Sequence, residues 1–147
     1  MKKEEFIEVL KNRKYLYEIQ GDKIIVTHNG SVDLENLKTL PPGVEFKNGG
    51  WVDLRSLETL PPGVEFKNRG FVYLSSLETL PPGVHFKNGG WVDLSSLETL
   101  PPGVEFNNGG NVWLSGLGWV DHNKRIRIEG VDNKRLLHLM IKKELLL

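Results

Sequence analysis

The chain of 147 residues contains no cysteine, which excludes disulfide bonds, thiolate nucleophiles and cysteine-ligated zinc. It also lacks an excess of either charge, because nineteen Lys and Arg residues balance nineteen Asp and Glu residues. A dedicated nucleic-acid-binding protein gains most of its affinity from excess cations that neutralise phosphates. The charge balance therefore argues against nucleic acid as the partner.

Long apolar runs are missing as well. No stretch approaches the roughly 18 residues that a membrane-spanning helix needs. The first twenty residues carry two early lysines, but Glu4, Glu5, Glu8 and Lys11 interrupt any apolar segment of the kind found in a signal peptide. We therefore expect a cytoplasmic protein that does not enter a membrane.

Catalytic motifs are not found either. The sequence has no Gly-x-Ser-x-Gly, no Gly-x-x-x-x-Gly-Lys and no His-Glu-x-x-His. The four histidines fall at unrelated places, so no spacing brings them to a shared metal ion. Three glutamates do recur at one spacing, and we expect them to be solvated, with cation binding along the row as the alternative: Glu58, Glu78 and Glu98. The sequence predicts a protein that is not an enzyme and that holds no cofactor and no metal.

What the sequence does have is glycine and proline at regular intervals. Pro-Pro-Gly recurs at one constant interval without slippage, at 41–43, 61–63, 81–83 and 101–103. A decayed unit precedes these copies from residue 24, and residues 124–128 resemble one more strand behind them. Self-similarity at a fixed period of this length is the signature of a solenoid. The repeats predict about five coils.

Each unit contains two short segments with the alternation typical of a strand. Val44 and Phe46 alternate with outward charged residues, and Val52 and Leu54 alternate with the outward residues Trp51 and Asp53. Between the segments, 48–50 reads Asn-Gly-Gly, and we expect a sharp corner at which the glycines take positive φ angles. The Pro-Pro-Gly of each unit suits a second corner, built on a type II turn.

One unit alone cannot bury its apolar side chains, because its top and bottom are open. In the second copy, six side chains are expected to point inward: Leu60, Val64, Phe66, Val72, Leu74 and Leu77. Stacking the units at roughly 4.8 Å closes the core and pairs the backbone into parallel sheets. The predicted fold class is mostly β, a parallel β-solenoid of about five 20-residue coils with an N-terminal α/β cap and a C-terminal capping helix.

The unit Leu-Pro-x-Gly-Val-x-Phe-x-Asn-Gly-Gly-x-Val-x-Leu resembles the short leucine-rich-repeat-like solenoids, of about 20 residues per repeat, that are common in bacteriophage and gut-bacterial genomes. The resemblance covers residues 24–117. The unit lacks the full L-x-x-L-x-L-x-x-N stretch of conventional leucine-rich repeats, so a curved horseshoe and a straighter two-sheet prism both stay open. The resemblance implies a protein that binds other macromolecules, with a host or defence complex as the partner of a phage-type inhibitor.

The two ends are expected to cover the raw edges of the solenoid (24–117), with all parts forming one folding unit. In the N-terminal cap (1–23), residues 3–14 have the spacing of an amphipathic helix, followed by strands over 15–19 and 23–26.

In the C-terminal segment (118–147), a strand precedes a helix that begins at Asp132 or Asn133 and runs to about Glu144. This helix is apolar on more than one face, so it either lies across the last coil or also contacts a second subunit. The candidate contacts of such a homodimer are Leu136, Leu139 and Leu146.

The outward positions of the second strand carry large aromatic residues. Trp51, Phe71 and Trp91 occupy one position in three consecutive coils. Trp and Tyr are enriched at binding hot spots, whereas rings that only stack on one another would merely stiffen the sheet. We favour binding, because these positions differ between coils while the core positions hardly change. The candidate partner-binding residues are Trp51, Asp53, Phe71, Tyr73, Trp91, Asp93 and Trp113.

Overall fold

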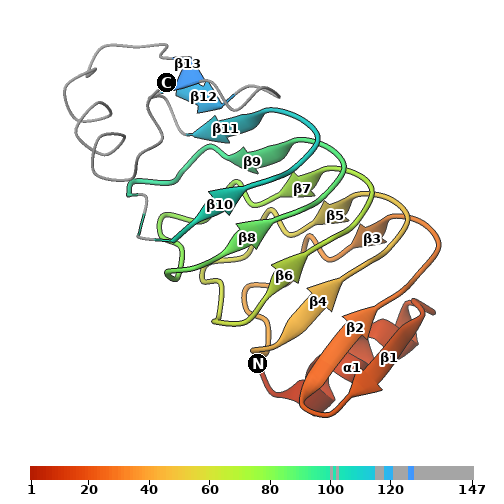
Figure 1. Ribbon diagram of the computed structural model, residues 1–147. Helices are drawn as coiled ribbons and strands as arrows, with labels where there is room; N and C mark the ends of the chain where they lie inside the picture. The colour runs from red at the N-terminus through yellow and green to blue at the C-terminus, as the bar shows by residue number, and fades with distance from the viewer. Residues whose placement is uncertain (100, 102, 115–117, 121–125, 128–147) are drawn as a thin grey trace.

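The computed structural model describes residues 1–99, 101, 103–114, 118–120 and 126–127. Within them the chain forms a parallel β-solenoid of about four turns, with one short helix at its N-terminus (Figure 1). Each turn adds one short strand to each of two sheets. The mostly-β solenoid predicted from the repeat is confirmed, while the predicted fifth coil and C-terminal helix extend into residues outside those described.

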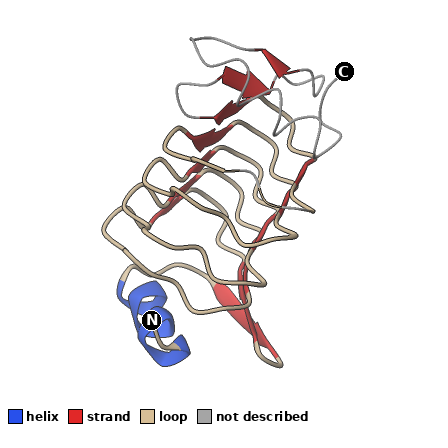
Figure 2. Ribbon diagram, turned by 90° about the vertical axis from the view of Figure 1, so that its left-hand side faces the viewer, coloured by secondary structure: helices blue, strands red, loops and turns tan. Residues whose placement is uncertain are grey.

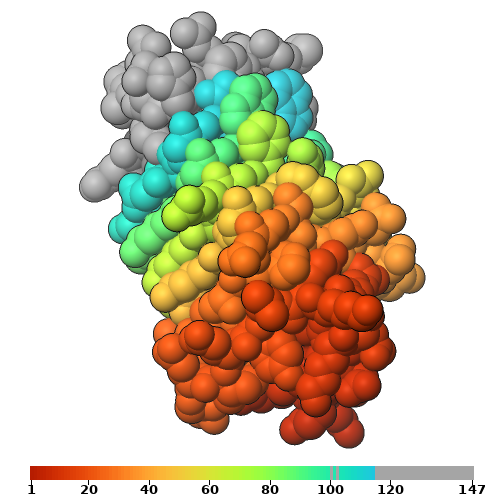
Figure 3. All heavy atoms as spheres, turned by 90° about the vertical axis from the view of Figure 1, so that its right-hand side faces the viewer, coloured from red at the N-terminus to blue at the C-terminus, as the bar shows by residue number. Residues whose placement is uncertain are grey.

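The first sheet grows by one strand with each repeat of the sequence. Its order is β1 (Tyr17–Gln20), β2 (Lys23–Val26), β4 (Val44–Phe46), β6 (Glu65–Phe66), β8 (His85–Phe86) and β10 (Glu105–Phe106). From β2 onward the strands are parallel, with Val26 opposite Phe46 and Phe46 opposite Phe66. Equivalent residues of successive coils therefore lie directly above one another, and Figure 3 shows the coils as successive bands of colour.

The second sheet is parallel over most of its length and then changes direction. Its strands in chain order are β3 (Val32–Asp33), β5 (Val52–Asp53), β7 (Val72–Tyr73), β9 (Val92–Leu94), β11 (Val112–Leu114), β12 (Gly118–Val120) and β13 (Ile126–Arg127). The strand predicted over 124–128 is present as β13. However, β12 runs antiparallel to β11, and β13 runs antiparallel to β12, so these strands do not continue the parallel stack.

The inward side chains of both sheets form one apolar core. The six side chains predicted to point inward in the second copy are all buried, with at most 6% of their surface exposed. One phenylalanine per coil builds a stacked column with ring centroids 5.4–5.5 Å apart, formed by Phe46, Phe66, Phe86 and Phe106. Full burial of such a side chain contributes about 1.5–3 kcal/mol, so this column is a major source of stability.

A second column, of buried asparagines, stands at the corner that joins the two sheets. Its members are Asn48, Asn68, Asn88 and Asn108. The side-chain amide of Asn68 donates to the carbonyl of Gly50 in the preceding coil (3.0 Å) and to those of Gly70 (3.2 Å) and Phe71 (3.1 Å) in its own coil. The same three contacts recur at the other three asparagines. The amide thus holds its own corner closed and ties it to the coil before.

The reason predicted for the corner glycines is wrong. Positive φ angles of 76–80° occur in the Pro-Pro-Gly turns, as a type II turn requires, but at none of the described glycines of the Asn-Gly-Gly corners. The constraint there is space between coils. In the copy whose corner reads Asn-Arg-Gly, a Cβ on Gly70 would lie 2.6 Å from the amide nitrogen of Trp51 and 2.7 Å from the carbonyl carbon of Gly50.

The N-terminal segment covers the first coil, as predicted. Helix α1 (Lys3–Asn12) lies at one end of the stack (Figure 2) and buries Phe6 and Leu10 in the core. Arg13 donates to the carbonyl of Asp33, and the hydroxyl of Tyr15 accepts from the Asp33 amide (2.9 Å). These two side chains bind the carbonyl and the amide of Asp33 in the edge strand β3, which would otherwise be free to pair with another strand. The described part of the chain includes no helix long and apolar enough to cross a bilayer.

The outer face of the first sheet carries a network of ion pairs around one buried carboxylate. Glu45 is only 5% exposed, and the ammonium of Lys67 lies 2.7 Å from its Oε1 and 3.1 Å from Oε2 of Glu65. Burial raises the pKa of Glu45, but the contact with Lys67 and the charges of Lys67, Lys47 and Lys23 outweigh it and hold the pKa below its ordinary value. Glu45 is therefore ionised at neutral pH.

Replacing Glu45 with glutamine should make the stability less sensitive to acid. Because its pKa is lower in the folded than in the unfolded state, Glu45 stabilises the fold above its unfolded pKa, and this contribution is lost as the pH falls through the folded pKa. Between about pH 5 and pH 3, we expect the free energy of unfolding of wild type to fall by roughly 1 kcal/mol more than that of the variant. The difference is small because Lys67 is partly exposed and solvent screens its charge. Denaturant titrations at both pH values measure the difference.

The matched control for this measurement is Glu78→Gln, which removes an exposed carboxylate from another coil. The control should keep the pH dependence of wild type. If Glu45→Gln also keeps it, the ion pairs of Glu45 do not contribute to acid sensitivity and the expectation is wrong.

Candidate functional site

The outer face of the second sheet carries an aromatic stripe. It comprises Trp51, Phe71, Tyr73, Trp91 and Trp113. Tyr73 is half-buried, whereas the other four are 37–45% exposed. The strands explain this placement, because alternate side chains point to opposite faces and the valines and leucines between the rings point into the core.

Neighbouring rings of the stripe touch one another. Phe71 stacks on Trp91, with centroids 6.1 Å apart and planes 17° apart. Tyr73 lies 6.0 Å from Phe71 and meets Trp51 edge-on at 6.4 Å. The rings therefore stack on one another, yet more than a third of the surface of Trp51, of Trp91 and of Phe71 stays exposed. Rings that are already held in place lose little side-chain freedom when a partner covers them.

A groove of about 320 Å³ lies within the stripe. Its aromatic walls are Phe71, Tyr73, Trp91 and Trp113, and its polar side chains are Asp93 and Ser95. The strand register explains this composition, since Asp93 lies opposite Tyr73 on one side and Trp113 on the other. The groove is thus an aromatic enclosure with one carboxylate.

The two aspartates of the second strand have different surroundings. Asp53 is 3% exposed and is covered by Arg55, whose Nε lies 3.0 Å from both carboxylate oxygens and whose Nη2 also donates to Oδ2. Asp93 is only half-buried, and its Oδ1 accepts a hydrogen bond from the Ser95 amide at 3.0 Å. Asp93 therefore borders the groove, whereas Asp53 is occupied within its own coil.

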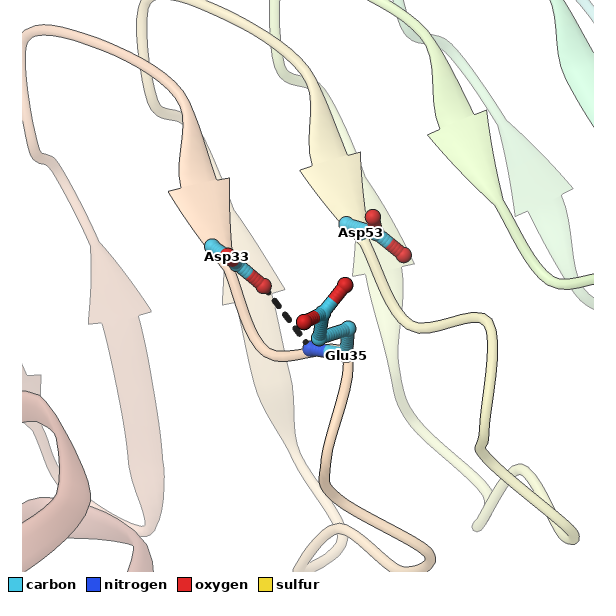
Figure 4. A group of neighbouring side chains, drawn as sticks. All are labelled: Asp33, Glu35 and Asp53. Atoms are coloured by element: carbon cyan, nitrogen blue, oxygen red, sulfur yellow. Dashed lines mark hydrogen bonds between the residues drawn. The ribbon is translucent and has the colours of Figure 1, made fainter.

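Asp53 also belongs to a group of three carboxylates on β3, on β5 and on the turn that follows β3 (Figure 4). Oxygen atoms of Asp33, Glu35 and Asp53 lie within 4.8 Å of one another. Arg55 lies 3.8 Å from Glu35 as well as on Asp53, and its hydrogen bond to Asp53 and the nearby negative charges raise its pKa. This guanidinium supplies a positive charge to the cluster, and we assign the cluster a structural role.

The structure thus gathers most of the predicted binding residues at one place. Phe71, Tyr73, Trp91, Asp93 and Trp113 line the groove, and Trp51 adjoins it through Tyr73. Sequence reasoning missed Ser95, although the signal was available, because the equivalent position of an earlier coil carries arginine. The predicted dimer contacts lie outside the described residues: Leu136, Leu139 and Leu146.

No protein-family model, no curated protein and no solved structure matches the chain.

Proposed function

We propose that the chain is a non-enzymatic interaction module that binds a protein partner through the aromatic stripe. The observation that carries this proposal is the exposure of Trp51, Phe71, Trp91 and Trp113, at 37–45% each, along one sheet face. Isolated apolar residues are normal on a protein surface, but a contiguous aromatic row around a groove is typical of an interface. Aromatic residues are also the commonest hot spots of binding energy.

Differences between the coils support the same conclusion. The inward positions hardly vary, as the phenylalanine column shows. The stripe positions vary instead: one reads Trp, Phe, Trp, Asn and the other Asp, Tyr, Asp, Trp in successive coils. Folding alone needs only the inward positions to be kept. A partner with its own non-repeating surface needs the outward positions to differ.

The nature of the partner is suggested by the repeat unit. Its resemblance to short leucine-rich-repeat-like solenoids of bacteriophages and gut bacteria supports a macromolecular partner. We infer that a host or defence complex, blocked by this module, is the first class of partner to test. Cytoplasmic complexes come first among these, because the sequence predicts a cytoplasmic protein.

A capture experiment with a matched control tests the proposal. The stripe variant is Trp51→Ser/Phe71→Ser/Trp91→Ser, and the control variant is Glu58→Ser/Glu78→Ser/Glu98→Ser, which alters three exposed residues of the same coils at the same spacing. We expect wild type and control to retain one partner from host lysate. With that partner purified, the stripe variant should bind at least about 100-fold more weakly, since each hot spot contributes about 2 kcal/mol or more.

Circular dichroism must show that all three proteins are folded. Undiminished binding by a folded stripe variant would place the interface elsewhere and contradict the proposal. The alternative, a self-assembling structural protein that dimerises through its C-terminal segment, is examined with the same samples by light scattering. A dimer that persists on dilution, is dissociated by Leu139→Glu and captures no other protein would replace the proposed function.

A further inference from the structure

We infer that the groove in the aromatic stripe receives an arginine side chain of the partner, with its guanidinium on Asp93. This inference rests on the proposed function and deepens it, because it names the chemistry that the partner must present. Two coils of the same chain, whose backbones are stacked in register by the repeat, provide the basis for it.

The second strand of one coil already shows how an aspartate at this position holds a guanidinium. Arg55 approaches the carboxylate of Asp53 edge-on, with Nε and Nη2 both donating. Such two-pronged contacts match the fork of donors on arginine to the two oxygens of a carboxylate, and they are shorter and stronger than neutral hydrogen bonds. Asp53 is consequently only 3% exposed, and both of its carboxylate oxygens accept hydrogen bonds from Arg55.

Two coils further along, the same aspartate has no such partner. Asp93 is equivalent to Asp53, but serine stands at position 95 in place of the arginine. The backbone turn is unchanged, because the amide at position 95 donates to Asp93 Oδ1 as the amide at position 55 donates to Asp53. Among the described residues no lysine or arginine forms an ion pair with Asp93. The groove is lined by both Asp93 and Ser95, which are equivalent to Asp53 and Arg55 of the earlier coil.

The walls of the groove favour a flat cation. The register places Tyr73 and Trp113 on the strands on either side of Asp93, with Trp91 two residues before it on the same strand. Two strand spacings of about 4.8 Å separate the backbones that carry Tyr73 and Trp113 by roughly 10 Å. A planar group in contact with a ring on each face needs about 7–8 Å. Because Asp93 lies on the strand between them, a guanidinium on its carboxylate is flanked by these two residues.

These features select arginine over other ligands. Guanidinium groups stack on aromatic faces and are more weakly hydrated than ammonium groups, so they enter a partly apolar groove at lower cost. A neutral ligand would leave the negative charge of Asp93 uncompensated under the cover of the partner. The carboxylate and the rings together thus specify a cationic, planar group.

The inference is tested by titrating the full chain with the blocked tripeptide Gly-Arg-Gly. Nuclear magnetic resonance of the tryptophan indole N–H groups reports on Trp91 and Trp113. We expect saturable shifts with a dissociation constant of the order of millimolar, as one buried side chain provides. The corresponding lysine peptide should bind at least about tenfold more weakly, because it lacks the two-pronged contact. The citrulline peptide, which keeps the shape but not the charge, should not bind.

Two variants of the groove sharpen the test. Asp93→Asn removes the charge, and Ser95→Arg supplies a guanidinium from the chain itself, as Arg55 does for Asp53. Both should abolish the shifts. Ser96→Arg is the charge-matched control, one residue along and exposed, and it should bind the peptide as wild type does. Retained binding in Asp93→Asn, or equal affinity for the arginine and lysine peptides, would overturn the assignment.

The inference and the proposed function can fail separately. If the stripe variant loses the captured partner but the arginine peptide causes no shifts at about 50 mM, the proposed function stands and the arginine site is overturned. If the peptide binds as expected but the partner is retained by the stripe variant, the groove recognises arginine while the proposed interface is wrong. If both experiments succeed, Ser95→Arg should also weaken binding of the whole partner.

Discussion

Replacing Asn68 with alanine is expected to lower the free energy of unfolding by about 3 kcal/mol. The side chain is 1% exposed, and its amide donates to the carbonyls of Gly50, Gly70 and Phe71. Alanine leaves these carbonyls inside the corner without that donor, and water cannot replace it without opening the stack. Each carbonyl keeps one other donor, from the Gly70 amide, the Asn88 side chain and the Val52 amide respectively. The size of the effect is therefore set by the loss of three hydrogen bonds, at about 1 kcal/mol each.

The measurement is denaturant unfolding, with Asn107→Ala as control. Asn107 precedes Asn108 of the asparagine column in another coil, and its side chain is exposed. Its loss should therefore change the free energy of unfolding by less than about 0.5 kcal/mol. Asn68→Asp gives a second, independent check, because it keeps the shape and replaces the donor by a carboxylate facing three carbonyls. It should be worse than alanine at neutral pH and recover in acid, where the protonated acid can donate again.

A small effect of Asn68→Ala, similar to that of the exposed control, would mean that the asparagine column does not hold the corners. Recovery of Asn68→Asp at high rather than low pH would contradict the donor role assigned to its side chain.

The second large effect is expected from Gly70→Ala, which adds only one methyl group. That carbon would lie 2.6 Å from the Trp51 nitrogen and 2.7 Å from the Gly50 carbonyl carbon, and both are backbone atoms that cannot turn aside. The two coils must separate, which lengthens the hydrogen bond from the Gly70 amide to the Gly50 carbonyl, now 3.1 Å. We expect a loss of about 3 kcal/mol or more, at the upper end of overpacking effects.

Gly83→Ala is the matched comparison, because it separates backbone strain from lack of space. Gly83 has a φ of +80° and no atom within 4 Å of an added Cβ. Alanine there carries only the cost of a left-handed conformation, about 1–2 kcal/mol. Thermal unfolding of the two variants measures the difference. Equal losses would show that the stack yields to the added methyl group, and that lack of space between coils is not what requires glycine at position 70.

The sequence alone was sufficient to predict which side chains of each coil point inward and that an N-terminal cap covers the first coil. The exact spacing of the repeats determines the register, and alternation around Phe66 and Val72 then determines which side chains are buried. The position of the stripe follows from the same alternation. These predictions succeed because they depend on periodicity, which is a property of the chain itself.

Predictions that depended on contacts between coils were less successful. Asn68 stands two residues before a glycine and therefore looks like an ordinary turn residue, since nothing local shows that its amide reaches Gly50 in another coil. The corner glycines were assigned to a backbone conformation for the same reason. Likewise, the burial of Asp53 depends on where the Arg55 side chain lies, and the reversal of the chain at β12 depends on pairing with β11.

The constant register has a consequence for how such a molecule can grow. Every coil meets the next through the same phenylalanine, asparagine and backbone contacts, displaced by one repeat. A duplicated unit inserted between residues 80 and 81 would find its usual neighbours on both faces and lengthen the stack by about 4.8 Å. The solenoid can therefore be lengthened by one coil at a time. Each added coil brings a pair of outward positions that can diverge without disturbing the core.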